Sequence, residues 1–253
     1  MNERISIAAA PLEAGAGPAG PVPREVGFMA GAKAVFRFSL PVTLVSRRTL
    51  MMGLLGTFLP LSAMVFLVVK AIPQAEIRRP GYIFYTGSFQ FIFYYVMLVA
   101  LFYGTAVVAE EIDWKTLTYL LVRPVSKGAI LVGKGAAAWT VGSMILLPVI
   151  TCTYLLFTLA DGLMFSGGAS SFWINLPTFL GDLLRVAGGL AVYTAVFMFL
   201  GAQFKHPVIW AIGVAFGWES WVAFVPGLTR KLTVMHYLQS LSPHAAARSI
   251  GIS

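Results

Sequence analysis

The sequence has little charge. Of its 253 residues, 11% are Asp, Glu, Lys or Arg and 58% are hydrophobic, whereas soluble domains have about 25% charged residues. A water-soluble chain of this composition would expose a large apolar surface, so the composition predicts a membrane protein. The net charge of +8 does not indicate nucleic acid as a partner, because basic residues also flank membrane spans on their cytoplasmic side.

Cysteine and clustered catalytic residues are also scarce. The single cysteine, Cys152, lies in an apolar run. It can form no intrachain disulfide, and we expect a buried structural thiol. The three histidines, His206, His236 and His244, are far apart, and the sequence has no HExxH motif. We therefore expect no catalytic residue, no metal site and no cofactor bound by this chain.

The N-terminal part precedes the long apolar segments. Residues 1–30 are rich in Ala, Gly and Pro and cannot bury enough apolar area to offset the entropy of ordering, which predicts a flexible cytoplasmic tail. Residues 31–48 mix Phe, Leu and Val with four basic residues, which predicts an amphipathic helix lying at the membrane interface. Pro41 would kink or interrupt it, and a plain linker is the alternative.

Long segments with almost no charge predict an all-α, polytopic integral membrane domain over residues 49–253. A helix needs about 20 apolar residues to cross the hydrocarbon core of a bilayer. Five segments fit that length: 49–69, 88–109, 135–160, 186–204 (beginning near residue 179) and 207–228. Because five spans leave the C-terminus outside, we expect a sixth span in the complete protein.

The fifth segment contains the carboxylate Glu219. Ionisable groups at membrane depth are costly and usually face protein or water. We expect Glu219 to line a pathway or to pack between helices, the alternative being a solvated position at the outer interface. Residues 226–245 are predicted to form an outer re-entrant or amphipathic segment, because Val234, Leu238 and Leu241 follow helical spacing. Asp182 and Arg185 are expected to pair locally.

Lysine and arginine are unevenly distributed between the two sides of these spans. If the N-terminus is cytoplasmic, the inner segments are the N-terminal arm, residues 110–134 and residues 205–206, which hold eleven of the 18 lysines and arginines. Cytoplasmic loops carry an excess of these residues. The bias predicts a multi-pass membrane protein with a cytoplasmic N-terminus and a cytoplasmic segment 110–134.

That segment, EEIDWKTLTYLLVRPVSKGAILVGK, is rich in charge between two apolar spans. Asp113 can cap a short helix, and Pro124 ends it, which gives a predicted helix over residues 113–123. Ser126 can cap the next helix. One face of the short helix is apolar and follows helical spacing: Trp114, Leu117, Leu120 and Leu121. The helix either covers the membrane surface or docks onto a soluble partner.

The segment resembles the cytoplasmic loop of ABC-2 type transporter permeases. That family typically has acidic residues, a Thr-Leu pair, a Leu-Leu pair, Pro-Val/Ile-Ser and Ile-Leu-x-Gly-Lys in this order. The corresponding residues are Glu110-Glu111, Thr116-Leu117, Leu120-Leu121, Pro124-Val125-Ser126 and residues 130–134. The resemblance extends from about residue 31 to the end of the chain. One departure is Lys115, at a position where the family commonly has Gly.

The resemblance implies the transmembrane permease subunit of an ATP-driven transporter, an exporter of the bacterial inner membrane. The loop would be a coupling helix held by a separate ABC ATP-binding subunit, which would bind the ATP and Mg²⁺. A second permease chain, identical or related, would complete the transporter in the lipid bilayer. The residues expected to contact the ATP-binding subunit are Glu110, Glu111, Asp113, Trp114, Thr116, Leu117, Leu120, Leu121, Arg123 and Pro124.

Two glycine-containing stretches match nucleotide-binding motifs only in part. Residues 128–135 (GAILVGKG) lack the Ser or Thr that holds magnesium in a phosphate loop and open a membrane span. Residues 165–170 lie on the predicted outer side. We therefore expect no ATPase site and no enzyme activity in this chain. The alternatives are a structural or regulatory membrane protein that recruits a soluble partner without transport, and a membrane-embedded enzyme acting on lipid.

Overall fold

The computed structural model describes residues 27–70, 89–113, 126–164, 168–222 and 231–241. All regular structure in these residues is helical, so the prediction of an all-α protein is confirmed. The elements, in chain order, are α1 (Phe28–Leu44), α2 (Arg47–Gly56), α3 (Phe58–Lys70), α5 (Phe89–Asp113), α7 (Lys127–Met164), α8 (Gly168–Gln203), α9 (Pro207–Ile212), η2 (Gly213–Glu219), α10 (Ser220–Val222) and α11 (Val234–Leu241).

Three helical stretches in the described residues are long and apolar enough to cross a membrane: Arg47–Val65, Lys127–Leu159 and Phe172–Gln203. Two shorter apolar helices, Phe91–Val107 and Pro207–Glu219, coincide with the other two predicted segments. At 1.5 Å per residue, the 38 residues of α7 extend about 57 Å, whereas the hydrocarbon core is about 30 Å thick. If α7 crosses a bilayer, it therefore extends well beyond the hydrocarbon.

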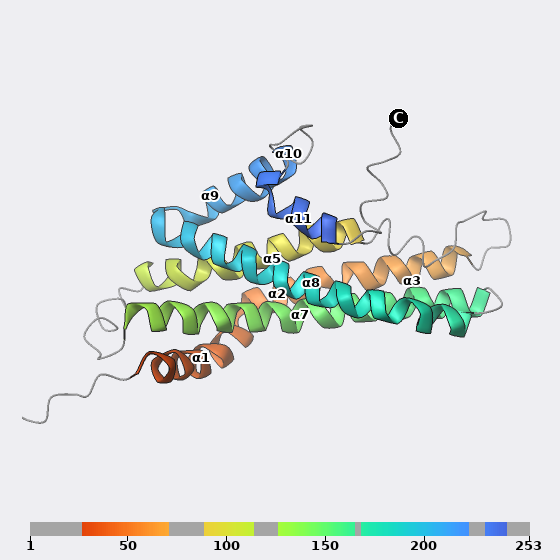
Figure 1. The fold of residues 1–253 in the computed structure, drawn as a ribbon, viewed down its shortest axis with the longest axis horizontal. Helices are drawn as coiled ribbons and strands as arrows, with labels where there is room; N and C mark the ends of the chain where they lie inside the picture. Colours follow the sequence, from red (N-terminus) through yellow and green to blue (C-terminus); the bar gives the residue numbers. More distant parts are fainter. Residues whose placement is uncertain (1–26, 71–88, 114–125, 165–167, 223–230, 242–253) are drawn as a thin grey trace, which may run out of the picture.

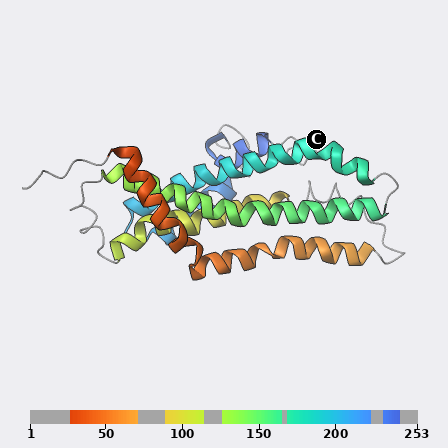
Figure 2. The ribbon, with the colours of Figure 1, turned by 90° about the horizontal axis from the view of Figure 1, so that it is seen from below.

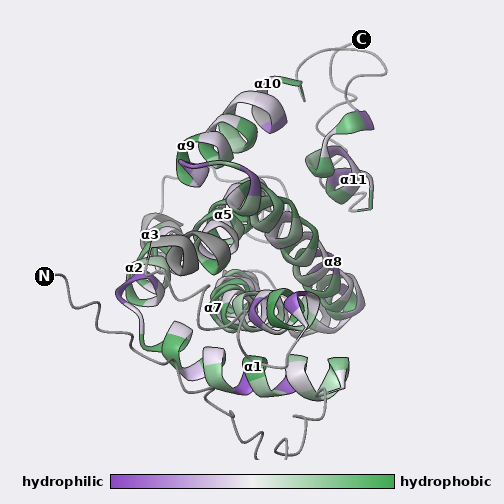
Figure 3. Cartoon of the chain, turned by 90° about the vertical axis from the view of Figure 1, so that its left-hand side faces the viewer, coloured by the Kyte–Doolittle hydropathy of each residue, from purple (hydrophilic) through white to green (hydrophobic). Residues whose placement is uncertain are grey.

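Helix α7 is the central element of the bundle. It contacts α1, α2, α3, α5 and α8, and a view along the bundle shows it surrounded by these helices (Figure 3). The most extensive contact in the bundle is between α5 and α8. Buried side chains from α5, α7 and α8 form one continuous apolar core, with Val96, Val141 and Phe197 inaccessible to solvent.

Helix α5 approaches α8 closely at Gly104. A Cβ atom at this position would lie 2.8 Å from the Cβ of Phe197 and 3.0 Å from the carbonyl oxygen of Thr194. Neither atom can move without displacing the α8 backbone. Small residues allow such close contact, which is a main source of helix association in membranes.

Helix α1 runs crosswise to the bundle. Figure 3 shows α1 from the side while α7 is seen nearly end-on, and Figure 2 shows α1 crossing the bundle near the beginning of α7. The two helices meet at Gly133, where a Cβ atom would lie 2.6 Å from the carbonyl oxygen of Ala32. Pro41 does not interrupt α1, which continues through it and ends at Leu44. Because Pro41 has no N–H, α1 lacks one intrahelical hydrogen bond at this point.

Helix α2 is tied to α5 by two tyrosine hydroxyls. Tyr95 donates to the carbonyl oxygen of Met52 (2.6 Å), and Tyr103 donates to the Thr49 hydroxyl (2.7 Å). The side chain of Ser46 caps α2 by accepting from the Thr49 N–H. Buried hydroxyls need partners of this kind, so these bonds fix the position of α2 along α5.

Two features differ from the sequence-based predictions. Cys152 is exposed on the outside of α7 rather than buried, because hydropathy alone does not distinguish a core-facing position from one on the outer, lipid-compatible surface. Helix α8 begins at Gly168, earlier than the span predicted to begin near residue 179. A helix can begin before the apolar run that it contains, so the apolar run does not mark the first residue of the helix.

We expect Gly104→Ala to destabilise the bundle, because overpacking of a tight contact typically costs about 1–3 kcal/mol. Gly188→Ala is a matched control: Gly188 is also within a helix, and a Cβ there would meet nothing within 4 Å. Both substitutions raise helix propensity. The difference between the two unfolding midpoints therefore reports the overlap of the new Cβ at position 104 with α8. Thermal unfolding of the detergent-purified chain measures it, and equal midpoints for the two variants would contradict the close contact.

Candidate functional site

The predicted coupling segment lies between α5 and α7. Glu110, Glu111 and Asp113 belong to the last turn of α5. Ser126 caps α7, since its hydroxyl oxygen accepts from the Ala129 N–H at 3.3 Å, as predicted. The other predicted contact residues lie outside the described residues: Trp114, Thr116, Leu117, Leu120, Leu121, Arg123 and Pro124.

The helix ends that border this segment lie at one end of the molecule. Figure 1 shows the end of α5, the start of α7, the start of α1 and the turn between α8 and α9 at the same end. The end of α3 and the end of α7 lie at the other end. The three segments predicted to be on the same side of the membrane, the N-terminal arm, 110–134 and 205–206, therefore adjoin helix ends that lie together.

Exposed basic residues accompany these helix ends. Lys33 and Arg37 on α1, Lys127 at the start of α7 and Lys205 after α8 are all exposed. Lys33 and Arg37 are four residues apart and share one face of α1. These four exposed cations can interact with anionic lipid or with an acidic protein surface.

A second candidate site is built around Glu219, the last residue of the π-helix η2. Its side chain is only 6% exposed. One carboxylate oxygen accepts from the backbone N–H of Val234 (3.0 Å), and the other accepts from the N–H of Met235 (3.1 Å) and from the hydroxyl of Tyr193 (3.2 Å). Glu219 thereby joins η2, α8 and the beginning of α11.

The start of α11 needs such partners, because the first four N–H groups of a helix have no acceptor within it. Thr233 supplies one acceptor, since its hydroxyl oxygen accepts from the His236 N–H at 3.3 Å. Glu219 supplies acceptors for the two preceding N–H groups. An acidic side chain at the start of a helix also interacts favourably with the helix dipole.

The π-helical geometry of η2 places Glu219 toward the bundle. Ala211, Ala215 and Glu219 are spaced four residues apart, and all three are buried. In an ideal α-helix, eight residues would rotate the last of them by about 80° from the first. The wider turn of a π-helix keeps these residues closer to one face. π-Helices are rare and occur frequently at functional sites.

Helix α11 packs on the middle of α8. Its buried side chains are Met235 and Leu238, and a Cβ at Gly189 would lie 2.8 Å from the Leu238 methyl carbons. Leu241, which shares the predicted apolar spacing, is 57% exposed. The buried face of α11 is therefore rotated toward Met235 relative to the predicted face.

The predicted local pair on α8 is confirmed. Arg185 donates to a carboxylate oxygen of Asp182 at 2.7 Å, with Asp182 almost fully buried and Arg185 partly exposed. Sequence reasoning did not find the partners of Glu219. The Tyr193 hydroxyl lies 26 residues away in a different apolar segment. Thr233, which caps α11 beside Glu219, does have a local signal, as a Thr that precedes a helical pattern.

Among the described residues, no three His, Cys, Asp or Glu side chains are grouped so that they could hold a metal ion. Comparison of the chain with family models, curated proteins and solved structures finds no match. The geometry of the described residues and the sequence pattern are thus the basis for a functional proposal.

We expect Glu219→Leu to release α11, because it removes the acceptors of two backbone N–H groups at a cost of about 1–3 kcal/mol for each buried group left unsatisfied. Hydrogen exchange of residues 234–238 should accelerate by about tenfold or more, since 1.4 kcal/mol corresponds to a factor of ten. Tyr193→Phe removes a single donor and should have a much smaller effect. Unchanged exchange in Glu219→Leu would show that the carboxylate does not hold α11.

Proposed function

We propose that this chain is the transmembrane permease subunit of an ABC-2 type transporter, acting as an exporter in the bacterial cytoplasmic membrane. The observation that carries the proposal is the ordered motif in residues 110–134, placed between two long apolar helices. ATP and Mg²⁺ would bind to a separate ATP-binding subunit. This chain would supply five spans, with the N-terminus in the cytoplasm, and the complete protein would have a sixth.

The described helices supply a physical route for coupling. The motif joins α5 directly to α7, and α7 contacts most of the other helices of the bundle. A partner that moves the linking segment would therefore move two helices that are packed into the core. Rigid-body displacement of packed elements is a common form of such transitions. Leu117, Leu120 and Leu121 would be the buried contacts with the partner, and the charged residues would form the rim.

The arrangement of helix ends supports the proposed orientation. The helix ends that border the coupling segment, the start of α1 and the turn at residues 205–206 lie at one end of the bundle (Figure 1). These are the segments in which lysine and arginine are enriched. The substrate pathway would then lie between two permease chains, identical or related, rather than within a single bundle.

The coupling role predicts that Leu120→Asp abolishes assembly with the ATP-binding subunit while the chain still inserts into the membrane. A charge placed in an apolar contact cannot be solvated once the partner binds. Thr118→Asp is the matched control, because Thr118 is on a different face of the predicted helix. Co-purification with the ATP-binding subunit measures assembly, and normal recovery of the Leu120→Asp complex would contradict the proposed contact.

Assembly of the wild-type chain with a soluble partner that does not hydrolyse ATP would instead favour a structural or regulatory membrane protein. Measurement of ATP hydrolysis by the purified complex separates these two functions. Turnover of lipid by the isolated chain, without ATP, would favour a membrane enzyme.

The orientation predicts that residue 119 is accessible only from the cytoplasm. Cys152 is the single native cysteine, so a Cys152→Ser background allows one cysteine to be placed at Tyr119. A membrane-impermeant maleimide should label Tyr119→Cys in inverted membrane vesicles and not in sealed right-side-out vesicles. The reverse pattern would place residues 110–134 outside and would exclude the coupling role.

A further inference from the structure

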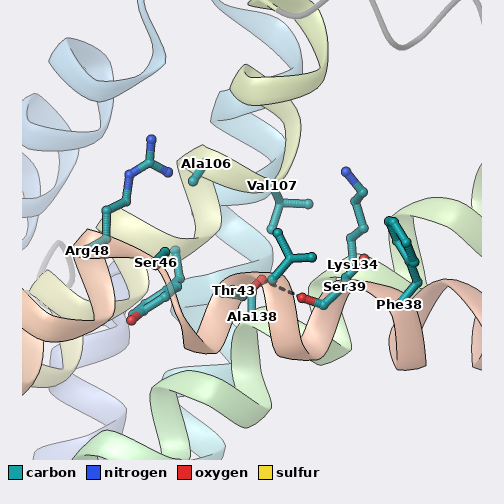
Figure 4. A pocket seen from close by; sticks show the side chains of 11 residues that line it. Phe38, Ser39, Thr43, Ser46, Arg48, Ala106, Val107, Lys134 and Ala138 are labelled. Carbon is teal, nitrogen blue, oxygen red and sulfur yellow. Dashed lines mark hydrogen bonds between the residues drawn. The ribbon is translucent and has the colours of Figure 1, made fainter.

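A cavity with both apolar and polar lining residues lies where α1 and the start of α2 meet α5 and α7. Its volume is about 210 Å³, below the range of about 300–1,000 Å³ typical of pockets for drug-sized molecules. The hydroxyl of Thr43, on its wall, donates to the carbonyl oxygen of Ser39 at 2.9 Å (Figure 4). Ser46 and Tyr103 also line it, and both bond to Thr49.

Among the described residues, the charged side chains that line the cavity are both cationic. Arg48 comes from α2 and Lys134 from α7. Figure 4 shows them on either side of Ala106 and Val107 of α5, extending in the same direction. Each also has an interaction within the chain. An arginine fork combined with a lysine point charge is suited to the oxygens of a phosphate group.

The cavity is at the edge of the apolar part of the bundle. Arg48 is the last charged residue before the charge-free segment 49–69, and Lys134 is the last before the charge-free segment 135–160. The cations that directly precede these charge-free segments, one on α2 and one on α7, therefore line the same cavity. In a bilayer this level corresponds to the boundary between hydrocarbon and headgroups, where phosphate groups lie.

Two of the exposed residues that line the cavity are large and apolar. Phe38 and Val42 of α1 line it and are 77% and 64% exposed. Large apolar side chains exposed beside cations and hydroxyls match a ligand with a phosphate group and hydrocarbon chains. They contribute nothing to the binding of a free phosphate ion, which favours a lipid as the source of the phosphate.

We propose that this cavity binds the phosphate of an anionic phospholipid, held by Arg48 and Lys134, with the acyl chains lying against Phe38 and Val42. The proposal goes beyond transport and requires no ATP-binding partner. In the orientation proposed above, the bound lipid belongs to the cytoplasmic leaflet. Basic pockets between membrane helices on that side commonly hold anionic headgroups.

The test uses the full chain purified in detergent, with short-chain phosphatidylglycerol, short-chain phosphatidylcholine and inorganic phosphate as probes. Phosphatidylglycerol should raise the thermal midpoint, and native mass spectrometry should detect the bound lipid. Phosphatidylcholine and inorganic phosphate at the same concentration should have little effect. The double variant Arg48→Gln/Lys134→Gln should bind phosphatidylglycerol at least about tenfold more weakly, since it removes two charge-assisted contacts.

The matched control is Lys33→Gln/Arg37→Gln, which removes two exposed cations of α1 that do not line the cavity. It should retain binding. Equal losses in the two double variants would show general surface attraction and overturn the site. An equal response to inorganic phosphate would exclude the lipid as the source of the phosphate.

A further pair of variants applies if the Arg48→Gln/Lys134→Gln chain does not fold. Val42→Trp narrows the mouth of the cavity and leaves both cations in place, so it should also weaken phosphatidylglycerol binding. Lys134→Arg keeps the charge and should preserve it. Wild-type binding in Val42→Trp would contradict a lipid seated in this cavity.

Discussion

Backbone groups within an apolar bundle have no water to bond with, and the satisfaction of these groups is the constraint on which the described structure depends. Helix starts are the weak points, since their first N–H groups lack partners. Ser46 and Ser126 cap α2 and α7 in the usual manner. Helix α11 begins against the bundle and requires more: Thr233 together with the carboxylate of Glu219. The buried carboxyl group of Glu219 therefore has a structural role at the start of α11. The π-helical geometry of η2 directs this side chain toward the bundle.

Close packing supplies the second part of the stability. Apolar side chains gain little by contacting each other instead of lipid tails, so helices associate through tight fit and a few polar links. Gly104 and Gly133 bring α5 against α8 and α1 against α7. The polar links are few but directed, as in the bond from the Trp139 indole to the carbonyl oxygen of Ala187 (2.9 Å). Such contacts leave little freedom for one helix to slide past another, which suits a bundle that moves as a body.

Much of the helical architecture could be predicted from the sequence because charge-free runs report helices directly. Ser126 marked the start of α7, and Asp182 and Arg185 paired as their spacing suggested. The prediction that Cys152 is buried was wrong, and α8 begins earlier than the span predicted from residue 179, because hydropathy does not report where a helix begins or which face it turns to its neighbours. The surroundings of Glu219 could not be predicted, since its partners lie 15 to 26 residues away and depend on the packing of α8 and α11. The apolar face of residues 113–123 stays a prediction, because residues 114–125 lie outside the described residues.

Gly133 and Lys134 are the last two residues of the motif at residues 110–134. Gly133 lies against the backbone of α1, and Lys134 lines the cavity between α1, α2, α5 and α7. If α7 moves along its axis in the transport cycle proposed above, α1 would have to move with it, because the two helices have no space between them at Gly133. If α1 also lies at the membrane interface, that motion would displace lipid, and the rate of the cycle would depend on the thickness and lateral pressure of the bilayer.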